Sequence, residues 1–418
     1  MHVPDLQRNP PTNQICAKVT RGRSLLISNS VTKSHMQTQK IIFLAGEDTY
    51  ILSHRLPAAR AAVRAGYEVH IVAQDTGKGQ DISNLGFVFH PRDADRKDRG
   101  PLALVKSILQ IRGLLKNEEP HILHNIGIQF ILVGMLATIG LRLQHIYNNV
   151  NGVGFMFTSS KASQTVARTL FTYSLRFLNK FHDVTYLFQN GHDHALFTQL
   201  RISSVTSPVI KGSGVDINHY KPVPLPIAPL TIGSACRMIG IKGVRDLITA
   251  VKMHNPSEVR LKLAGLPDAG NPSSLKPDEL EDLAIDEQIE WLGHVDDMFE
   301  FWSGCHVGAL MSHGGEGVPM TLLQPAAMAR PILTTNVPGN HSLVCREENG
   351  FTVPAGDAEA IATAITKLLN ADLQKMGQRS HTHIISAEFS SAAVEDALFS
   401  IYSAGHDSAT PAVISKSK

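Results

Sequence analysis

The chain has 418 residues, of which 43% are hydrophobic and 18% charged, a balance that fits one or two ordinary globular domains. Its formal net charge of +2 gives no reason to expect a nucleic-acid partner. The four cysteines lack metal-ligand and CxxC spacing, as in reduced cytosolic proteins. The longest apolar run, residues 126–141, is too short for a membrane span and is interrupted by glycines.

Residues 1–38 are rich in Pro, Asn, Ser and Thr and show little apolar periodicity, which predicts a disordered or non-native extension. A transit peptide is the alternative, since Asp5 alone opposes the basic residues. Strands and helices then alternate, which predicts a parallel, doubly wound sheet. Pro57 lies inside the first expected helix and should kink it. The expected strands are 40–45, 67–73, 86–90, 121–124, 145–150, 184–188 and 208–211, and the helices 51–65, 102–116, 128–141, 162–181 and 191–200.

A proline-rich segment, residues 221–229, marks a domain boundary, after which the alternation restarts. We therefore expect an extension at 1–38, a first Rossmann-like domain at 39–221, a second at 222–389, a C-terminal helix at 390–404 and a disordered tail at 405–418. The expected strands of the second domain are 230–235, 259–264, 288–292, 306–311, 331–335 and 350–354, and the helices 243–253, 276–284, 296–303, 357–371, 373–387 and 391–403.

The stretch from Ser312 to Gly339 has the pattern of a βαβ unit with a ligand site at its first turn. A buried strand at 307–311 is followed by a glycine turn containing Glu316, an apolar helix and a short strand at 331–335. Open α/β sheets bind ligands at the carboxyl ends of their strands. The helix N-terminus adds unpaired N–H groups and about half a positive charge, which suits phosphate.

This stretch resembles the donor-binding signature of retaining GT-B glycosyltransferases of family 4. The signature has Glu-Gly-hydrophobic-Pro, a second Glu eight residues after the first, and a small-residue helix before a Pro-led strand. Eight further segments match family landmarks, which makes nine in the expected order with the central stretch, over approximately residues 39–403. Together they most resemble a bacterial branch of the family that builds lipid-linked surface glycans. The further segments are 67–73, 121–124, 188–190, 212–216, 237–243, 263–265, 291–293 and 349–350. The resemblance implies a GT-B fold: two Rossmann-like doubly wound domains facing a cleft, acceptor in the first and donor in the second, with the last helix crossing back to the first domain.

The signature implies roles for individual residues. Glu316 would lie against the donor sugar, and Gln324 stands where the second Glu accepts from the ribose hydroxyls. An amide oxygen can still accept, without charge and with one acceptor atom. Alternatively, Thr321 and Gln324 form a capping box. The remaining donor-side candidates are Gly317, Val318, Pro319 and Met320.

Arg237 and Lys242 follow the first strand of the second domain and match the family's cations. They would stabilise the negative charge of a departing nucleoside diphosphate without a metal, so we expect no cofactor beyond the nucleotide-sugar donor. The alternative is a pair of solvated loop cations. Asp93-Ala-Asp95 matches the metal-binding motif of GT-A glycosyltransferases, but it lies in a run of mixed charge and predicts a solvated loop. We therefore expect no metal site.

The first domain is expected to hold the acceptor. Asn151 could hydrogen-bond a hydroxyl but could not act as a general base at neutral pH. The alternative for the other side chains is that they are satisfied surface or core residues. The acceptor-side candidates are Asn151, Gly152, His54, Arg55, His124 and Asn125.

The sequence thus predicts a retaining hexosyltransferase. It would move a hexose or N-acetylhexosamine from a UDP-sugar to a saccharide acceptor carried on a polyprenyl diphosphate, in the synthesis of surface polysaccharide (O-antigen, capsule or exopolysaccharide). We expect a cytoplasmic protein with peripheral contact to the inner membrane. The alternatives are a GT-B UDP-sugar epimerase and a catalytically weak scaffold protein, the latter suggested by Gln324, Pro325 and Pro57.

Overall fold

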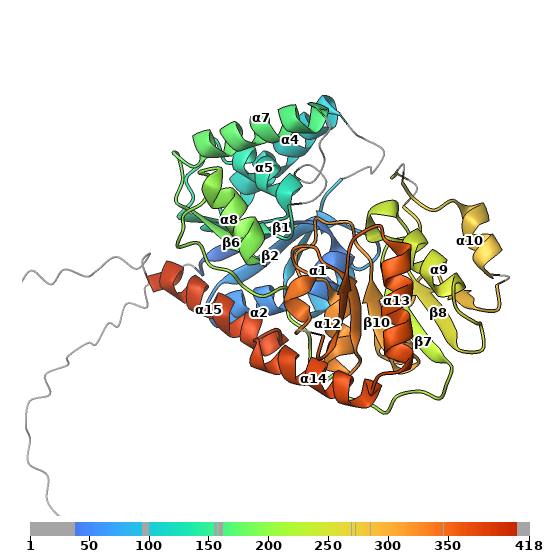
Figure 1. Ribbon diagram of the computed structural model, residues 1–418. Coiled ribbons are helices and arrows are strands. Elements are labelled where there is room, and N and C mark those ends of the chain that lie inside the picture. Colours follow the sequence, from blue (N-terminus) through green and yellow to red (C-terminus); the bar gives the residue numbers. More distant parts are fainter. Residues whose placement is uncertain are drawn as a thin grey trace, which may run out of the picture. The chain divides into compact units, whose positions relative to one another are not determined.

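The computed structural model describes residues 38–93, 100–153, 157, 162–268, 270–271, 273–284, 286–345 and 347–407 (Figure 1). The predicted extension, apart from Thr38, lies outside these ranges. Two parallel sheets of six strands form the framework of the described part. They confirm the predicted pair of doubly wound domains.

The first sheet has the strand order β3-β2-β1-β4-β5-β6. Its central strands, β1 and β4, are almost wholly buried, because helices cover both faces. α4, α5 and α7 form one helical layer, with α5 in contact with both neighbours (Figure 1). The strands are β1 (Lys40–Glu47), β2 (Glu68–Gln74), β3 (Val88–Pro91), β4 (Ile122–Ile126), β5 (His145–Val150) and β6 (Val184–Phe188), and the helices α1 (Asp48–His54), α2 (Leu56–Arg64), α3 (Gly79–Asn84), α4 (Pro101–Glu118), α5 (Ile128–Ala137), α7 (Ala162–Leu178) and α8 (Gly191–Gln199).

The second sheet repeats this topology, with the order β12-β11-β10-β7-β8-β9. In both sheets the first strand of the domain lies at the centre, and the later strands are added first on one side of it and then on the other. That switch point is where open α/β sheets bind ligands. The strands are β7 (Leu230–Ala235), β8 (Val259–Ala264), β9 (Ile289–Trp291), β10 (Val307–Leu310), β11 (Ile332–Thr335) and β12 (Gly350–Val353), and the helices η1 (Gly240–Lys242), α9 (Val244–Lys252), α10 (Pro277–Ala284), α11 (Met298–Ser303), α12 (Met320–Ala327), η2 (His341–Leu343), α13 (Ala358–Leu369), α14 (Leu373–Ser386) and α15 (Ser391–Asp407).

Two expected elements differ in the structure. The single helix at 51–65 is two helices, α1 and α2, which meet at Arg55. Pro57 is therefore in the first turn of α2, where its missing N–H costs no hydrogen bond, and the predicted kink takes the form of a break between two helices just before the proline. The expected strand at 208–211 forms only an isolated bridge between Val209 and Phe188.

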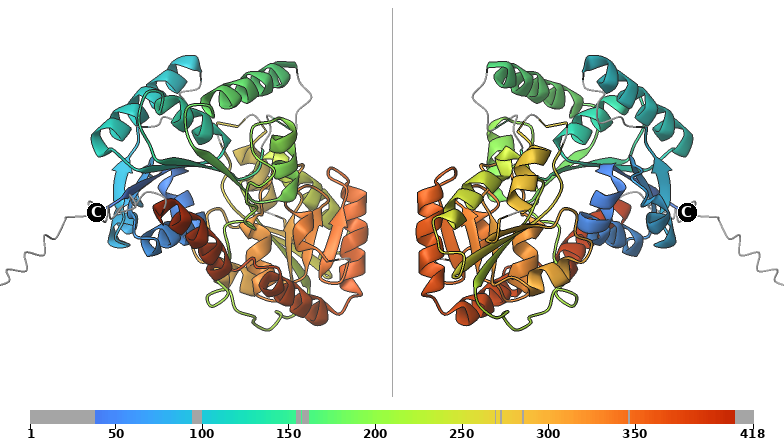
Figure 2. Two further views of the ribbon diagram at one scale, coloured as in Figure 1. Left: turned by 90° about the vertical axis from the view of Figure 1, so that its left-hand side faces the viewer. Right: turned by 90° about the vertical axis from the view of Figure 1, so that its right-hand side faces the viewer.

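The last helix, α15, packs on the first domain. Val394, Leu398 and Tyr402 belong to the apolar core that includes β1, β2 and α2. On the surface, Arg64 of α2 forms ion pairs with Glu395 and Asp396. Figure 2 shows α14 and α15 running from the second domain to the first. The helix continues to Asp407, so residues 405–407 are not part of a disordered tail, and the rest of the predicted tail lies outside the described residues.

Candidate active site

The glycine turn between β10 and α12 is shaped by backbone conformations that favour glycine. Gly314 and Gly315 have φ values of 132° and 77°, in the left-handed region. Gly317 has a different reason, because a Cβ there would collide with the side-chain oxygen of Gln189 from the first domain. Pro319 then caps the N-terminus of α12. The turn is therefore held close to the first domain.

Glu316 is fixed inside this turn by two donors. Its Oε1 atom accepts hydrogen bonds from Ser312 Oγ and from Lys242 Nζ, each at 2.6 Å. The side chains of Glu316 and Lys242 are 12% and 20% exposed, so the ion pair is partly shielded from water. Gly243, at φ 66°, lets η1 approach the backbone of Met311 and places Lys242 at the turn. The structure thus brings together two of the three predicted catalytic residues.

Arg237, the third, forms an ion pair with a different carboxylate. Its side chain is 63% exposed, and its Nη1 atom donates to Asp268 Oδ2 at 2.8 Å. Arg237 and Asp268 follow the neighbouring strands β7 and β8, whose carboxyl ends share one edge of the sheet. Asp268 was not among the predicted site residues, although its position after β8 was a usable signal.

Two first-domain residues that were not predicted as site residues contact the turn. Gln189 Oε1 accepts from the backbone N–H of Val318 at 3.2 Å, and Asn190 Nδ2 donates to the carbonyl of Glu316 at 3.5 Å. In the sequence, this Gln-Asn pair was only one of the landmarks of the family resemblance. Gly152 also meets the turn, since a Cβ there would collide with the carbonyl oxygen of Gly315. The loops after β5 and β6 therefore touch the glycine turn.

Arg55 forms the centre of a polar group in the first domain. It is 3% exposed, and its Nη2 atom donates to Asn151 Oδ1 at 2.6 Å and to Tyr50 Oη at 2.9 Å. Asn151 Nδ2 donates to the same tyrosine oxygen at 2.8 Å. Among the described residues, Arg55 has no carboxylate within ion-pair distance, and its Nε lacks a hydrogen-bond partner. A buried guanidinium without a counter-charge favours an anionic ligand.

His54 lies beside this group and connects it electrostatically to the second domain. Its ring stacks on Tyr50, with 4.6 Å between centroids, and its Nδ1 lies 2.7 Å from Ser53 Oγ. Desolvation, with the positive charges of Arg55 and Lys242, lowers the pKa of His54 to about 3. The imidazole is therefore neutral at pH 7. The positive charge of Lys242, in the second domain, lowers the pKa of this side chain of the first domain.

His124 and Asn125, the other acceptor-side candidates, lie in the core. Both are completely buried, with His124 Nδ1 2.8 Å from Tyr402 Oη and Asn125 Nδ2 donating to Asn148 Oδ1 at 2.8 Å. Burial, followed by the charge of Arg55, lowers the pKa of His124 to about 3. This placement corrects the acceptor prediction in favour of its alternative, because neither side chain is accessible to a ligand.

Gln324 is held at both ends of its amide. Oε1 accepts from Trp302 Nε1 at 2.9 Å, and Nε2 donates to Tyr220 Oη at 2.9 Å. The capping-box alternative is wrong, because the cap of the helix is Pro319, so Thr321 lies inside the helix and Gln324 is not three residues after the cap. Contact with a ribose would use the second lone pair of Oε1.

Potential metal ligands lie elsewhere. Among the described residues, one group of three could hold an ion, formed by His70, His90 and Glu118. It lies near the amino ends of β1 and β2, and its carboxylate already pairs with Lys40 at 3.0 Å. Of the Asp93-Ala-Asp95 motif, Asp95 lies outside the described residues.

Known glycosyltransferases are similar to this chain in sequence and fold. A "Glycosyl transferase 4-like" family model matches residues 40–185, and a "Glycosyl transferases group 1" model matches residues 229–371. The capsular polysaccharide biosynthesis glycosyltransferase CapM of Staphylococcus aureus is 23% identical over 393 residues, covering 88% of this chain and 97% of its own.

Two further similar proteins have ligands or substrates in their descriptions. An Escherichia coli UDP-Gal:alpha-D-GlcNAc-diphosphoundecaprenol alpha-1,3-galactosyltransferase is 20% identical over 63% of this chain and 70% of its own. The crystal structure of Anabaena HepE in complex with UDP superposes with a TM-score of 0.66 at 16% identity, covering 88% of this chain and 100% of that one. In the described part of the chain, no helix combines the length and apolar character needed to cross a bilayer.

Proposed function

The chain belongs to the family 4-like glycosyltransferases of GT-B fold, and we propose that it is a retaining enzyme that moves a hexose or N-acetylhexosamine from a UDP-sugar to a polyprenyl-diphosphate-linked saccharide. The similar proteins support this substrate pair. One is described as taking UDP-Gal and a diphosphoundecaprenol-linked acceptor, and another is solved with UDP. The proposed process is the synthesis of O-antigen, capsule or exopolysaccharide.

The ion pair between Lys242 and Glu316 is the observation that carries the proposal. It lies beside the first turn of α12, whose N-terminus favours an anion. The ammonium would take part of the charge that develops on the leaving diphosphate, so no metal is needed for that step. Glu316, held by Ser312 and Lys242, would orient the donor sugar, with the backbone of 317–320 alongside.

Arg237 would act on the same diphosphate after exchanging partners. In the structure its guanidinium is paired with Asp268. The ion pair is largely exposed on the arginine side, so breaking it costs little. A diphosphate would then compete with the carboxylate for the bidentate face of the guanidinium.

The group around Arg55 would bind the acceptor or its phosphate. Asn151 is fixed by Arg55 and Tyr50 and could hydrogen-bond a sugar hydroxyl beside Gly152. A pKa of about 3 makes His54 a poor general base at neutral pH, but its neutral ring can hydrogen-bond an acceptor hydroxyl. We place the enzyme in the cytoplasm, in peripheral contact with the inner membrane that carries such acceptors.

A donor and acceptor screen tests the proposal. The full chain is incubated with a panel of UDP-sugars and polyprenyl-diphosphate-linked saccharides, and UDP release, product mass and anomeric configuration are measured. Transfer with retention is expected, strongly reduced in Glu316→Gln and unchanged in Glu279→Gln, a control that also removes a carboxylate paired with a cation. Epimerisation of the UDP-sugar without acceptor would favour an epimerase, and UDP binding without turnover on the whole panel would favour a scaffold protein.

A further inference from the structure

The outer surface of α7 carries an unusual row of exposed apolar side chains. Each of the five is between 59% and 65% exposed. The four within the helix fall in an arc of about 60°, given 3.6 residues per turn. Phe181, just after the helix, packs edge-on against Phe177, with 5.0 Å between centroids. We call this row the α7 stripe: Val166, Leu170, Tyr173, Phe177 and Phe181.

A second exposed apolar row lies on α4, in the same helical layer. Leu102, Val105 and Leu109 are 86%, 51% and 62% exposed and follow helical spacing. α5 contacts both α4 and α7, so the two helices border the same layer (Figure 1). Isolated exposed apolar residues are ordinary, but two such rows in one layer indicate an interaction surface.

The charges near the two rows are predominantly basic. α7 contains no Asp or Glu, and α4 contains only Glu118, at its last residue. Lys106 and Lys116 of α4, and Lys180 just after α7, are exposed. An apolar face bordered by cations and poor in carboxylates complements an anionic, partly apolar partner.

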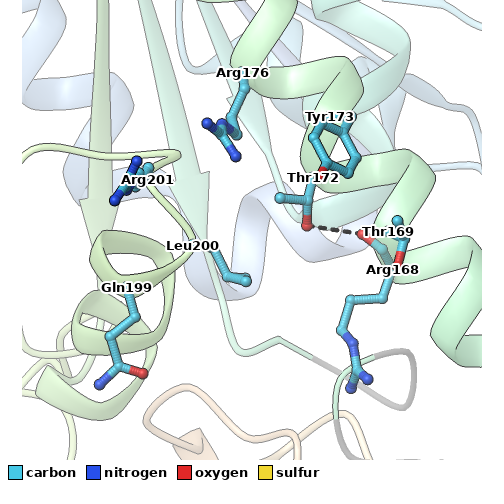
Figure 3. Close-up of a pocket in the computed structure, with 8 residues that line it drawn as sticks. All are labelled: Arg168, Thr169, Thr172, Tyr173, Arg176, Gln199, Leu200 and Arg201. Carbon is cyan, nitrogen blue, oxygen red and sulfur yellow. Dashed lines mark hydrogen bonds between the residues drawn. The ribbon is translucent and has the colours of Figure 1, made fainter.

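A pocket of about 320 Å³ opens beside the α7 stripe. Arg168 and Arg176 line it from α7 and Arg201 from the segment after α8, with Tyr173 shared between the pocket and the stripe (Figure 3). Among the described residues, none of the three arginines pairs with a carboxylate. The three guanidinium groups line one opening without converging on a single point, since Arg168 points away from Arg176 and Arg201 (Figure 3). Unpaired cations spread around an opening favour an anionic surface such as one that carries phosphate groups.

We propose that the α7 stripe and the α4 row are the surface by which the enzyme docks on an anionic phospholipid bilayer. The apolar side chains would enter the interface, while the arginines around the pocket contact lipid headgroup phosphates. A bilayer fits better than a protein partner because apolar side chains and phosphate-binding cations occur together on one helix. This inference names the surface that would make the membrane contact proposed above. It rests on the proposed lipid-linked acceptor only for the reason why the enzyme would bind a membrane.

Vesicle co-sedimentation of the full chain tests this surface. We expect binding to phosphatidylcholine vesicles containing about a third phosphatidylglycerol, weaker binding to phosphatidylcholine alone, and weakening by salt. Leu170→Glu with Phe177→Glu should reduce the binding roughly tenfold or more. Ile385→Glu is the matched control, since Ile385 is 50% exposed on helix α14 of the second domain. Arg168→Gln with Arg176→Gln should remove the preference for the anionic vesicles.

Three results would overturn the proposal. The first is no wild-type binding to vesicles, and the second is wild-type binding that the glutamate variant leaves unchanged. The third is a wild-type dimer in size-exclusion chromatography that the glutamate variant converts to a monomer, which would make the stripe an interface between two copies. The glutamate variant should retain turnover on a short-chain, water-soluble acceptor. If the wild type binds vesicles but transfers no sugar to any acceptor, the proposed function fails and the docking surface stands.

Discussion

Replacing Lys242 with Ala tests the central ion pair most directly. Its ammonium lies 2.6 Å from Glu316, and the side chain is only 20% exposed. An ammonium about 4 Å from a phosphate charge contributes roughly 4 kcal/mol at an effective dielectric constant of about 20. Glu316 already neutralises part of that charge, so we expect a loss of about 2–4 kcal/mol of transition-state stabilisation, the range for a lost preorganised donor.

This loss corresponds to a fall in kcat of roughly 30- to 900-fold. The assay is UDP release under saturating donor and acceptor, with Lys252→Ala as the control. Lys252 is in the same domain and also pairs with a carboxylate, Asp286, but it lies on the outside of α9. Because Lys242 and Glu316 form one unit, the double variant with Glu316→Gln should lose less than the sum of the single losses.

A second measurement separates an electrostatic role from a structural one. Lys242 contributes to the low pKa of His54, so Lys242→Ala should raise that pKa, which NMR titration of the imidazole can follow. A folded Lys242→Ala protein whose kcat stays within about threefold of the wild type would refute the reasoning, because the ammonium would then contribute less than about 1 kcal/mol.

Two further predictions concern Gln324 and His124. The carboxylate of Gln324→Glu can still accept a hydrogen bond from Trp302 and, after rotation of the hydroxyl, from Tyr220, so the variant should fold. It should bind both UDP and uridine more tightly than the wild type, by at most about 1–2 kcal/mol. Equal calorimetric affinities for wild type and variant would rule out a ribose contact. His124 stays neutral in the folded protein while the unfolded chain gains a proton below about pH 6.5, so His124 lowers the unfolding free energy as pH falls. His124→Phe should therefore reduce the loss in unfolding free energy between about pH 7.5 and pH 5.5 by about 1.4 kcal/mol in urea titrations. The lost bond to Tyr402 affects both pH values alike, and an unchanged difference between them would contradict the assigned pKa.

Local patterns were enough to predict most of the fold. Buried parallel strands are continuous apolar runs, so their positions could be read from the sequence. Helix interruptions were harder, because Pro57 is compatible with either a kink or a new first turn, and the choice depends on where the preceding helix ends. Helix α1 ends at His54, shortly before the proline, and no capping side chain marks the start of α2.

The site was predictable only in part. Glu316 and Lys242 are 74 positions apart, and the family resemblance, rather than any local pattern, placed them together. Gln189 and Asn190 contact the glycine turn through the packing of one domain on the other, which sequence periodicity does not encode. His124 was misjudged for a related reason, since its partner, Tyr402, is on a helix 278 residues later.

The packing of α15 on the first domain also determines the order in which the protein can fold during synthesis. Val394, Leu398 and Tyr402 fill the core of a domain whose strands are translated first. The second domain is translated between the two, so the first domain leaves the ribosome with part of its apolar core uncovered. That core is closed only after α15 emerges. The first domain therefore completes its folding only after the second domain has been translated, and residues 39–221 expressed alone would expose the apolar surface that α15 covers.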